Sequence, residues 1–346
     1  MTRAAPLAEL ERRAAALVEL EPPTVVRKQT LPPSGDIHDY LSMAPYWWPN
    51  PDTPDGLPWV QRDGDVNPRS RDIPDKQGWY TLIDLVWVLG HAHHELARKE
   101  YAEKAAVCLR AWFLEPATQM NPNLNFGQGV PGVAEGRPAG LIETREIGKL
   151  LEGVRLLEGS DAWSAGDTDC IREWVRAFLA WLAASPLAEA ERKAHNNHAT
   201  WYAAQAAAML EFAGERSRAL EVVGDGRALV EHQILPDGSQ PQEMTRANSR
   251  HYCMFNLLGF CRLAELGDRI GAPIWEHRSL RCGFEHLVAN WDDWPVPTLT
   301  PMATDVSEFA EVLYHAARHY GGTFLERWER TAAPSDLNEL FWGKLR

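Results

Sequence analysis

The chain has 346 residues, of which 45% are hydrophobic, and it carries a formal net charge of -13. This composition permits a sizeable core and argues against disorder, and the negative charge argues against nucleic acid as a general partner. No run of about 18 apolar residues indicates a membrane span. Residues 1–21 carry charges within a helical pattern and lack the apolar segment of a signal peptide, so we expect a cytoplasmic protein.

The cysteines are few and scattered. An odd set without a CxxC pair, in a chain of this length, predicts buried thiols in a reducing compartment and not a disulfide framework. The five residues are Cys108, Cys170, Cys253, Cys261 and Cys282.

Residues up to about Pro74 are rich in proline, glycine and aspartate, which predicts a long irregular region. A loop of such length within a compact protein is usually functional. Apolar residues then recur at helical spacing, first from Gly78 to Tyr101 and then from Tyr101 to Leu114. Further helices are expected at about 141–158, 168–185, 198–214, 216–234, 249–266, 278–289, 304–319 and 323–332.

Strand patterns are sparse, and the predicted helices have similar lengths and mostly short connections. This organisation predicts an all-α fold, namely an α/α toroid of helical hairpins with a long N-terminal loop region. A helical solenoid is the structural alternative. Because no linker divides the chain, we expect residues 1–346 to form a single domain.

Common motifs for nucleotide binding, zinc-dependent proteolysis and serine hydrolysis are absent. His91, His93 and His94 lie close together, but the glutamate of a zinc-binding helix is missing. That spacing is more typical of a packed or solvated helix face. We therefore expect neither a metal nor a cofactor.

The stretch AHNNHATWYAAQ, residues 194–205, concentrates neutral hydrogen-bonding groups at the start of a helix. Asn196 or Asn197 fits the preferred residue type of an N-cap. One cap does not explain why His198 and Trp201 stand beside them, with Trp201 on the same helix face as Asn197. A capping role and a functional role both stay open at this point.

A second stretch, LPDGSQPQEMTRANSRHYCMFNLLGF at residues 235–260, contains a PDGS turn followed by basic and aromatic residues. Arg246 and Arg250 are one helical turn apart, and His251 and Tyr252 follow directly. Such a cationic cluster is rare in an acidic chain. Two surface arginines beside a packed tyrosine are the alternative interpretation.

Polar and aromatic residues interleave in two loop stretches, SGDIHDYLSMAPYWWPNP at 34–51 and NPNLNFGQGVPGVAEGRPAGLIETREI at 121–147. Loop residues often carry function. Tyr46, Trp47 and Trp48 suit either sugar binding or a hydrophobic plug. The 15 tryptophans of the chain also suit sugar binding, although most large aromatic residues pack in cores.

These motifs, in this order, resemble the alginate lyase superfamily of polysaccharide lyases, from about Ser34 to Thr300. The resemblance implies an α/α toroid that cleaves a uronate polysaccharide, such as alginate or glucuronan, by β-elimination. It implies catalytic roles for Asn197, His198, Arg246 and Tyr252. Arg250 is a rival for the arginine, because the spacing from Arg246 to Tyr252 is a residue shorter than in the family. The implied substrate-binding residues are Tyr46, Trp47, Trp48, Asn125, Gln128, Arg145, Trp201, Arg250 and His251.

The chemistry of elimination explains these residue types. Asn197 and the arginine would hydrogen-bond the uronate carboxylate and stabilise the charge that develops on it. His198 would complete this clamp or act as a base. Tyr252, activated by the nearby arginine, would remove the C5 proton and then protonate the C4 oxygen.

Two other functions stay open on the sequence. A glycoside hydrolase would need two carboxylates flanking the scissile bond, and Glu143, Glu243 and Asp39 are available but not visibly paired. A non-catalytic sugar-binding protein would keep the aromatic residues alone. For the lyase, the expected partner is an anionic polysaccharide or oligosaccharide substrate. Substrate identity, endo or exo cleavage and the oligomeric state are open.

Overall fold

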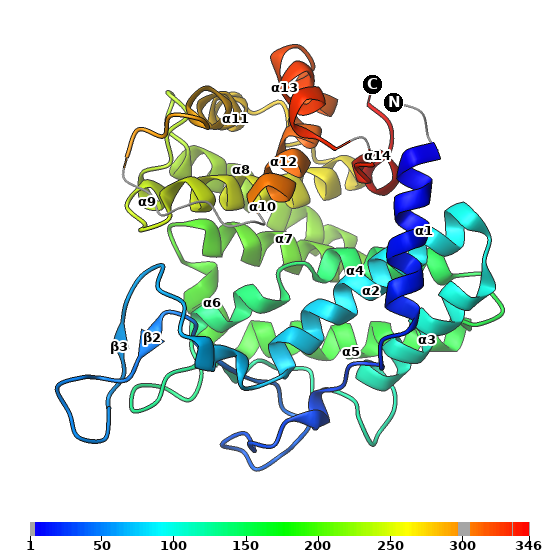
Figure 1. The fold of residues 1–346 in the computed structure, drawn as a ribbon, viewed down its shortest axis with the longest axis vertical. Helices are drawn as coiled ribbons and strands as arrows, with labels where there is room; N and C mark the ends of the chain where they lie inside the picture. The colour runs from blue at the N-terminus through cyan, green and yellow to red at the C-terminus, as the bar shows by residue number, and fades with distance from the viewer. Residues whose placement is uncertain (1–3, 297–304, 334, 346) are drawn as a thin grey trace. The chain divides into compact units, whose positions relative to one another are not determined.

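The computed structural model describes residues 4–296, 305–333 and 335–345 (Figure 1). Its backbone contacts form two compact units. Unit 1 comprises Met1–Glu9, Arg192–Glu211 and Glu215–Arg346, and unit 2 comprises Leu10–Glu191 and Phe212–Gly214. This division of the chain by backbone contacts does not test the expectation of a single domain, which stays a prediction.

Unit 2 is organised around α2 (Asp75–Leu96), which packs against α3 (Lys99–Phe113) and α4 (Ile147–Leu157). Gly90 of α2 and Gly153 of α4 allow these two helices to approach closely. A Cβ atom built on Gly153 would lie 2.7 Å from the Val86 carbonyl oxygen, so any larger residue would force the helices apart. Helix α5 (Ala165–Ala184) packs on α3, and α6 (Pro186–Arg192) follows α5 in the chain.

Before α2, the chain of unit 2 forms short elements. Strand β1 (Leu41–Met43) pairs in parallel with β4 (Phe126–Gly129), and β2 (Trp47–Trp48) pairs antiparallel with β3 (Val60–Gln61). The 3-10 helices are η1 (Val25–Arg27), η2 (Pro68–Arg71) and η3 (Pro138–Thr144). The predicted irregular region is confirmed here in its main features.

The irregular region begins later than expected, because α1 (Ala4–Val18) forms where residues 1–21 show a helical pattern. Its Leu10 and Ala14 are four residues apart and fully buried. An apolar face with this spacing stabilises a helix when it is covered, and proline and glycine become frequent only after this segment.

Unit 1 is organised around α10 (Ser249–Ile270), which is buried along most of its length. It packs against α8 (Arg216–Gln233), α9 (Pro241–Met244), α11 (Arg278–Asn290) and α12 (Asp305–Tyr320). The other helices of this part of the chain are α7 (Asn197–Phe212), α13 (Thr323–Thr331) and α14 (Asn338–Trp342). Helices adjacent in sequence, such as α12 and α13, pack together as helical hairpins do.

The all-α prediction is confirmed, since the strands among the described residues have only two to four residues each. Most predicted helices coincide with observed ones to within a few residues. The helix expected at 141–158 is divided into η3 and α4. Residue 304, the first residue of the helix expected at 304–319, lies outside the described ranges.

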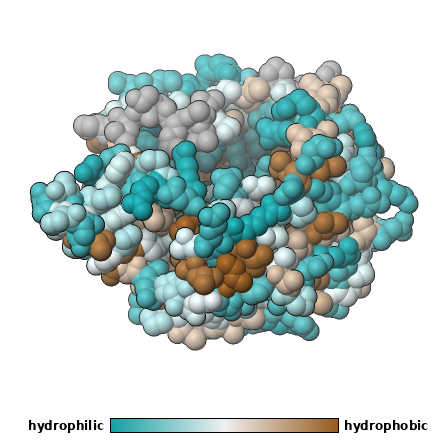
Figure 2. Space-filling view, turned by 60° about the horizontal axis from the view of Figure 1, so that its bottom comes forward, coloured by the Kyte–Doolittle hydropathy of each residue, from teal (hydrophilic) through white to brown (hydrophobic). Residues whose placement is uncertain are grey.

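Within the described ranges, no helix combines the length and apolar character that crossing a bilayer requires. On the face shown in Figure 2, hydrophobic residues occur in small areas set among hydrophilic ones. Scattered apolar surface of this kind is ordinary for globular proteins.

Candidate active site

The two asparagines at the start of α7 have different environments. The side-chain oxygen of Asn196 accepts a hydrogen bond from the backbone N–H of His198 at 3.3 Å, so Asn196 caps the helix. Asn197 donates both its backbone N–H, at 2.6 Å, and its side-chain Nδ2, at 2.8 Å, to the carboxylate of Glu243. Capping therefore explains Asn196 and leaves Asn197 for another role.

Glu243 and Asn197 form a buried pair in unit 1, with 1% and 0% of their surface exposed. Burial raises the pKa of Glu243, while the hydrogen bonds from Asn197 and the charges of Arg246 and His198 lower it. The remaining polar atom of the Asn197 side chain, Oδ1, is buried and has no hydrogen-bond partner among the described residues. An orphaned buried acceptor costs about 1–3 kcal/mol. Because Asn197 is fully covered, substrate contact would require its covering groups to move.

Arg246 and Tyr252 form the second feature of this site. The guanidinium carbon of Arg246 lies 3.7 Å from the centroid of the Tyr252 ring, within the range of a cation–π contact. Tyr252 is in the first turn of α10 and is 8% exposed. Arg250, in contrast, donates from Nη1 to the Trp291 carbonyl at 2.9 Å and covers that indole ring. Of the two rival arginines, Arg246 is therefore the one stacked on the tyrosine.

Three further predicted residues lie in the same unit. His198 follows Asn197 in the first turn of α7 and is half-buried. His251 stacks on Phe255 with ring centroids 5.7 Å apart. Trp201 is fully buried, with its ring centroid 5.0 Å from that of Phe255. In this structure Trp201 offers no open face to a sugar, and its proposed role in substrate binding stays a prediction.

A network of buried amides fixes the helices that carry these groups. Gln233 at the end of α8 accepts hydrogen bonds from Thr200 of α7 and Asn256 of α10 at 2.9 Å. Asn256 also donates to Gln240, just before α9, at 2.8 Å. Hydrogen bonds between buried polar groups favour one arrangement of the surrounding elements, although Asn256 Oδ1 has no hydrogen-bond partner among the described residues. These hydrogen bonds thus link α7, α8, α10 and the residue just before α9.

In unit 2, the predicted tryptophans lie side by side on β2 and point to opposite faces, as alternating strand residues do. Trp47 packs against the apolar cluster of Ala44, Trp59 and Val130. Trp48 instead donates from Nε1 to the Asp65 carbonyl at 3.0 Å. Trp47 therefore packs against the apolar cluster, whereas Trp48 does not belong to it.

Gln128 of β4 has an unusual backbone conformation, with a positive φ of 51°. Non-glycine residues rarely adopt this region, and such positions cluster at functional sites. Its backbone N–H donates to Ser42 at 2.7 Å, and its side-chain oxygen accepts from Arg137 at 3.0 Å. Arg137 in turn lies 5.3 Å from the centroid of the Trp47 ring.

Arg137 was not among the residues singled out from the sequence. Burial lowers the pKa of this arginine, while the charges of Glu191 and Glu143 raise it, and its guanidinium donates to the backbone and side-chain oxygens of the neutral Gln128. A half-buried guanidinium with neutral partners suits an anionic ligand. No local pattern identified it, because the contacts to Trp47 and Gln128 form only on folding.

The other predicted residues of unit 2 make defined contacts. Asn125 is exposed and accepts a hydrogen bond from the Trp181 indole at 2.9 Å. Arg145 donates to the Tyr80 hydroxyl at 2.8 Å and lies over its ring. Tyr46 is half-buried and accepts from the backbone of Arg62.

The three carboxylates considered for a hydrolase are all buried and bound. Glu143 accepts from the hydroxyls of Tyr40, at 2.8 Å, and Ser42, at 2.6 Å. Asp39 accepts from Ser34, Asn121 and Asn123, and Glu243 binds Asn197 as described. Each carboxylate is thus committed to contacts within the protein.

Comparison with known proteins gives these groups a context. The family model described as alginate lyase matches residues 24–293. The chain belongs to the alginate lyase family. It is therefore a member of a family of polysaccharide lyases, which confirms the resemblance noted in its motifs. No curated protein sequence matches the chain.

Solved alginate lyases share the fold. The crystal structure of an alginate lyase from Bacteroides ovatus has a TM-score of 0.93 at 28% identity, over 99% of this chain and 94% of that one. Alginate lyase A1-III from Sphingomonas species A1 has a TM-score of 0.62 at 14% identity, over 98% and 96% of the two chains. A histidine-to-alanine variant of alginate lyase A1-III complexed with a tetrasaccharide has a TM-score of 0.63 at 14% identity, over 99% and 96%.

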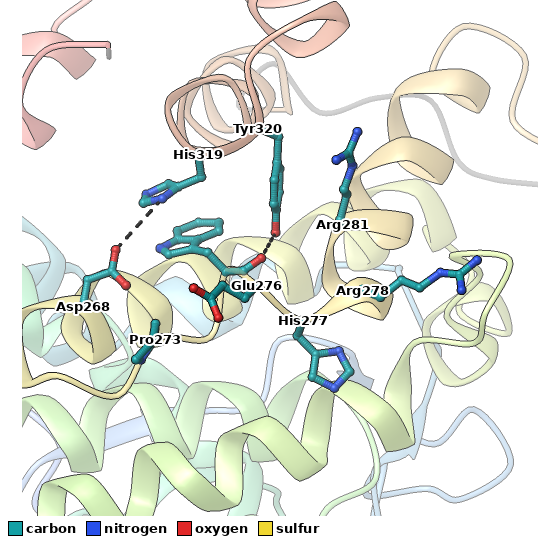
Figure 3. A pocket seen from close by; sticks show the side chains of 9 residues that line it. Asp268, Pro273, Glu276, His277, Arg278, Arg281, His319 and Tyr320 are labelled. Carbon is teal, nitrogen blue, oxygen red and sulfur yellow. Dashed lines mark hydrogen bonds and ion pairs between the residues drawn. The ribbon is translucent and has the colours of Figure 1, made fainter.

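Unit 1 also contains a pocket of about 560 Å³ (Figure 3). It is lined by Asp268 at the far end of α10, about 24 Å along the helix from Tyr252 at 1.5 Å per residue. Its aromatic side chains pack on one another: the rings of Trp275 and His319 stack with centroids 3.9 Å apart. Tyr320 donates from its hydroxyl to the Trp275 carbonyl at 2.8 Å. The stacked rings contribute to packing more than to an open binding face.

Among the described residues, His, Cys, Asp and Glu side chains form no group of three that could hold a metal ion. His91, considered as a ligand from the sequence, bonds the Trp87 carbonyl through Nδ1 at 2.8 Å. Burial lowers the pKa of His91. The expectation that no metal or cofactor takes part stays a prediction.

Proposed function

We propose that the protein cleaves a uronate-containing polysaccharide or oligosaccharide of the alginate or glucuronan type by β-elimination, leaving an unsaturated uronate end. The observation that carries this proposal is the stacking of the Arg246 guanidinium on the Tyr252 ring at 3.7 Å. It joins a permanent cation and a proton-transfer group in one site, and elimination at a uronate needs both. The substrate class is supported by the similarity to solved alginate lyases, one of them complexed with a tetrasaccharide.

Arg246 acts first, by binding the uronate carboxylate. The C5 hydrogen is a poor acid because the neighbouring carboxylate resists additional negative charge. A guanidinium hydrogen-bonded to that group stabilises the charge that develops when the proton leaves. Arginine suits this role because it stays protonated and offers several donors.

Tyr252 transfers the proton. Its hydroxyl, as the phenolate, removes the C5 hydrogen, and the same oxygen then donates a proton to the C4 oxygen of the leaving sugar. One group serves both steps when the two reacting atoms lie on the same side of the ring. His198, half-buried at the start of α7, completes the carboxylate clamp and is the alternative base.

Unit 2 carries further residues suited to sugar binding. Trp48 presents an indole that is not tied to the core cluster, and sugars pack their apolar faces on such rings. Arg137 and Gln128 add hydrogen-bond donors suited to a carboxylate or hydroxyl. Tyr46, Asn125 and Arg145 remain candidates for the same role.

Product absorbance tests the proposal. The purified protein is incubated with mannuronate-rich alginate, guluronate-rich alginate, glucuronan and a glycosaminoglycan, and near-ultraviolet absorbance is followed beside reducing ends. A lyase raises both signals together on at least one polymer, because each elimination creates a conjugated unsaturated uronate. Reducing ends without absorbance would indicate a hydrolase, and binding without either signal would indicate a sugar-binding protein; both outcomes contradict the proposal.

A further inference from the structure

Glu243 is bound to Asn197 through both of its carboxylate oxygens. Oε1 accepts from the backbone N–H at 2.6 Å, and Oε2 accepts from the side-chain Nδ2 at 2.8 Å. Glu243 is held on the short helix α9, which packs on α10. The pair therefore links the element that carries Asn197 to the element that carries Tyr252.

The carboxylate determines which end of the Asn197 amide faces it. An ionised carboxylate only accepts hydrogen bonds, so it pairs with the amide nitrogen and repels the amide oxygen. Rotation of the amide by half a turn would bring two acceptors together. Glu243 thus leaves the second Nδ2 hydrogen and Oδ1 for other partners, and Oδ1 has none among the described residues.

Burial opposes the ionised state of Glu243, and several neighbouring groups favour it. Electrostatic interactions with Arg246, which follows α9, and with His198 on α7 lower the pKa of Glu243. Cys253, on α10, also interacts with Glu243, but burial raises the pKa of its thiol well above the usual value, so it stays neutral. Arg246 is thereby attracted toward the carboxylate and kept beside Tyr252.

We propose that Glu243 is a positioning residue for the elimination: it orients the Asn197 amide so that Oδ1 accepts a hydrogen bond from a hydroxyl group of the uronate substrate. The inference rests on the proposed function and deepens it. It assigns the carboxylate of the sugar mainly to Arg246 and the remaining Nδ2 hydrogen. A ligand hydroxyl would also satisfy the buried oxygen that the protein leaves without a donor.

A double-mutant cycle tests whether Glu243 acts through Asn197. Glu243→Gln replaces an acceptor by a donor, so one of the two contacts to Asn197 is lost. By analogy with partners that orient metal ligands, we expect kcat to fall about 10- to 100-fold. In an Asn197→Ala background, the same change should lower kcat by less than about twofold, because residues that act as a unit are not additive. Fully additive effects would overturn the inference.

The pH profile separates positioning from a purely structural role. Protonated Glu243 no longer accepts from both N–H groups, so wild-type kcat should fall with decreasing pH as Glu243 takes up its proton. Because burial raises the pKa of Glu243 above 4.5, this limb should lie above that pH. Glu243→Gln should lack the limb. Glu143→Gln is a matched control that removes another fully buried carboxylate; it should lower the melting temperature and keep the limb.

The side-chain amide resonances of Asn197 report the contact independently of activity. In the wild type they should exchange slowly with solvent, and Glu243→Gln should shift them and speed their exchange. Unchanged resonances would overturn the inference at the level of the contact. If the wild type makes no unsaturated product on any uronate polymer, the proposed function and the positioning role of Glu243 are both refuted. If product forms but the cycle is additive, only the role of Glu243 falls.

Discussion

Tyr252→Phe separates chemistry from packing at the proposed active site. The change removes one oxygen from a ring that is 8% exposed and lies against Arg246 and His251. Phenylalanine keeps these ring contacts, so the free energy of unfolding should fall by about 0.5–1.5 kcal/mol, the usual cost of one hydrogen bond. Loss of a general acid–base group slows turnover by about 10²- to 10⁴-fold, equivalent to about 3–5 kcal/mol on the barrier. The kinetic effect should therefore exceed the effect on stability.

The assay is steady-state formation of unsaturated product, beside thermal unfolding and direct binding of an oligouronate. Affinity should persist, because the hydroxyl acts mainly in the transition state. Tyr320→Phe is a suitable control: it removes a hydroxyl that bonds the Trp275 carbonyl in the pocket of Figure 3. It should have a comparable effect on stability and leave turnover near the wild-type value. If Tyr252→Phe retains near-wild-type turnover, the proposed base is wrong and His198 becomes the leading candidate.

Three further predictions concern affinity, acid stability and salt. Trp48→Ala should weaken oligouronate affinity with a small change in melting temperature. Trp47→Ala should lower the melting temperature more, because the Trp47 ring packs on the cluster around Trp59. Equal effects of the two changes on affinity and on melting temperature would contradict this distinction. Asp167 has its pKa lowered from 3.8 to about 2, chiefly by hydrogen bonds from Arg110. Its contribution to stability, about 1 kcal/mol after solvent screening, is present above pH 3.8 and lost as the pH falls toward 2, so Asp167→Asn should reduce the acid sensitivity of unfolding in that window. Because the protein and its proposed substrate are both anionic, activity should peak at intermediate ionic strength; a steady decline from very low salt would refute this expectation.

The regular elements were predictable because helical periodicity is a local property. The apolar spacing in residues 249–266 predicted α10, and the observed helix is Ser249–Ile270. The division of 141–158 into η3 and α4 was not predicted, because apolar residues recur on both sides of Glu143 and Thr144. These two polar residues are buried by tertiary contacts. Glu143 is held there by hydroxyls from a segment about 100 residues earlier in the chain.

The candidate site was only partly predictable. Arg246 and Tyr252 are six residues apart, and local sequence brings them near one another. The choice between Arg246 and Arg250 depended on which guanidinium stacks on the tyrosine, and Arg250 is instead held by Trp291, some 40 residues away. Whether these residues carry out the catalysis stays a prediction.

By itself, the sequence determined the all-α architecture, the family and the residue types of the candidate site, because helical periodicity and short motifs are encoded by neighbouring residues. Tertiary structure decided how the polar groups pair. Asn196 and Asn197 are adjacent and chemically identical, yet the first caps α7 and the second is bound by Glu243, 46 residues away. A buried carboxylate must find hydrogen-bond donors wherever the fold supplies them, and no pattern of neighbouring residues specifies which donor that will be.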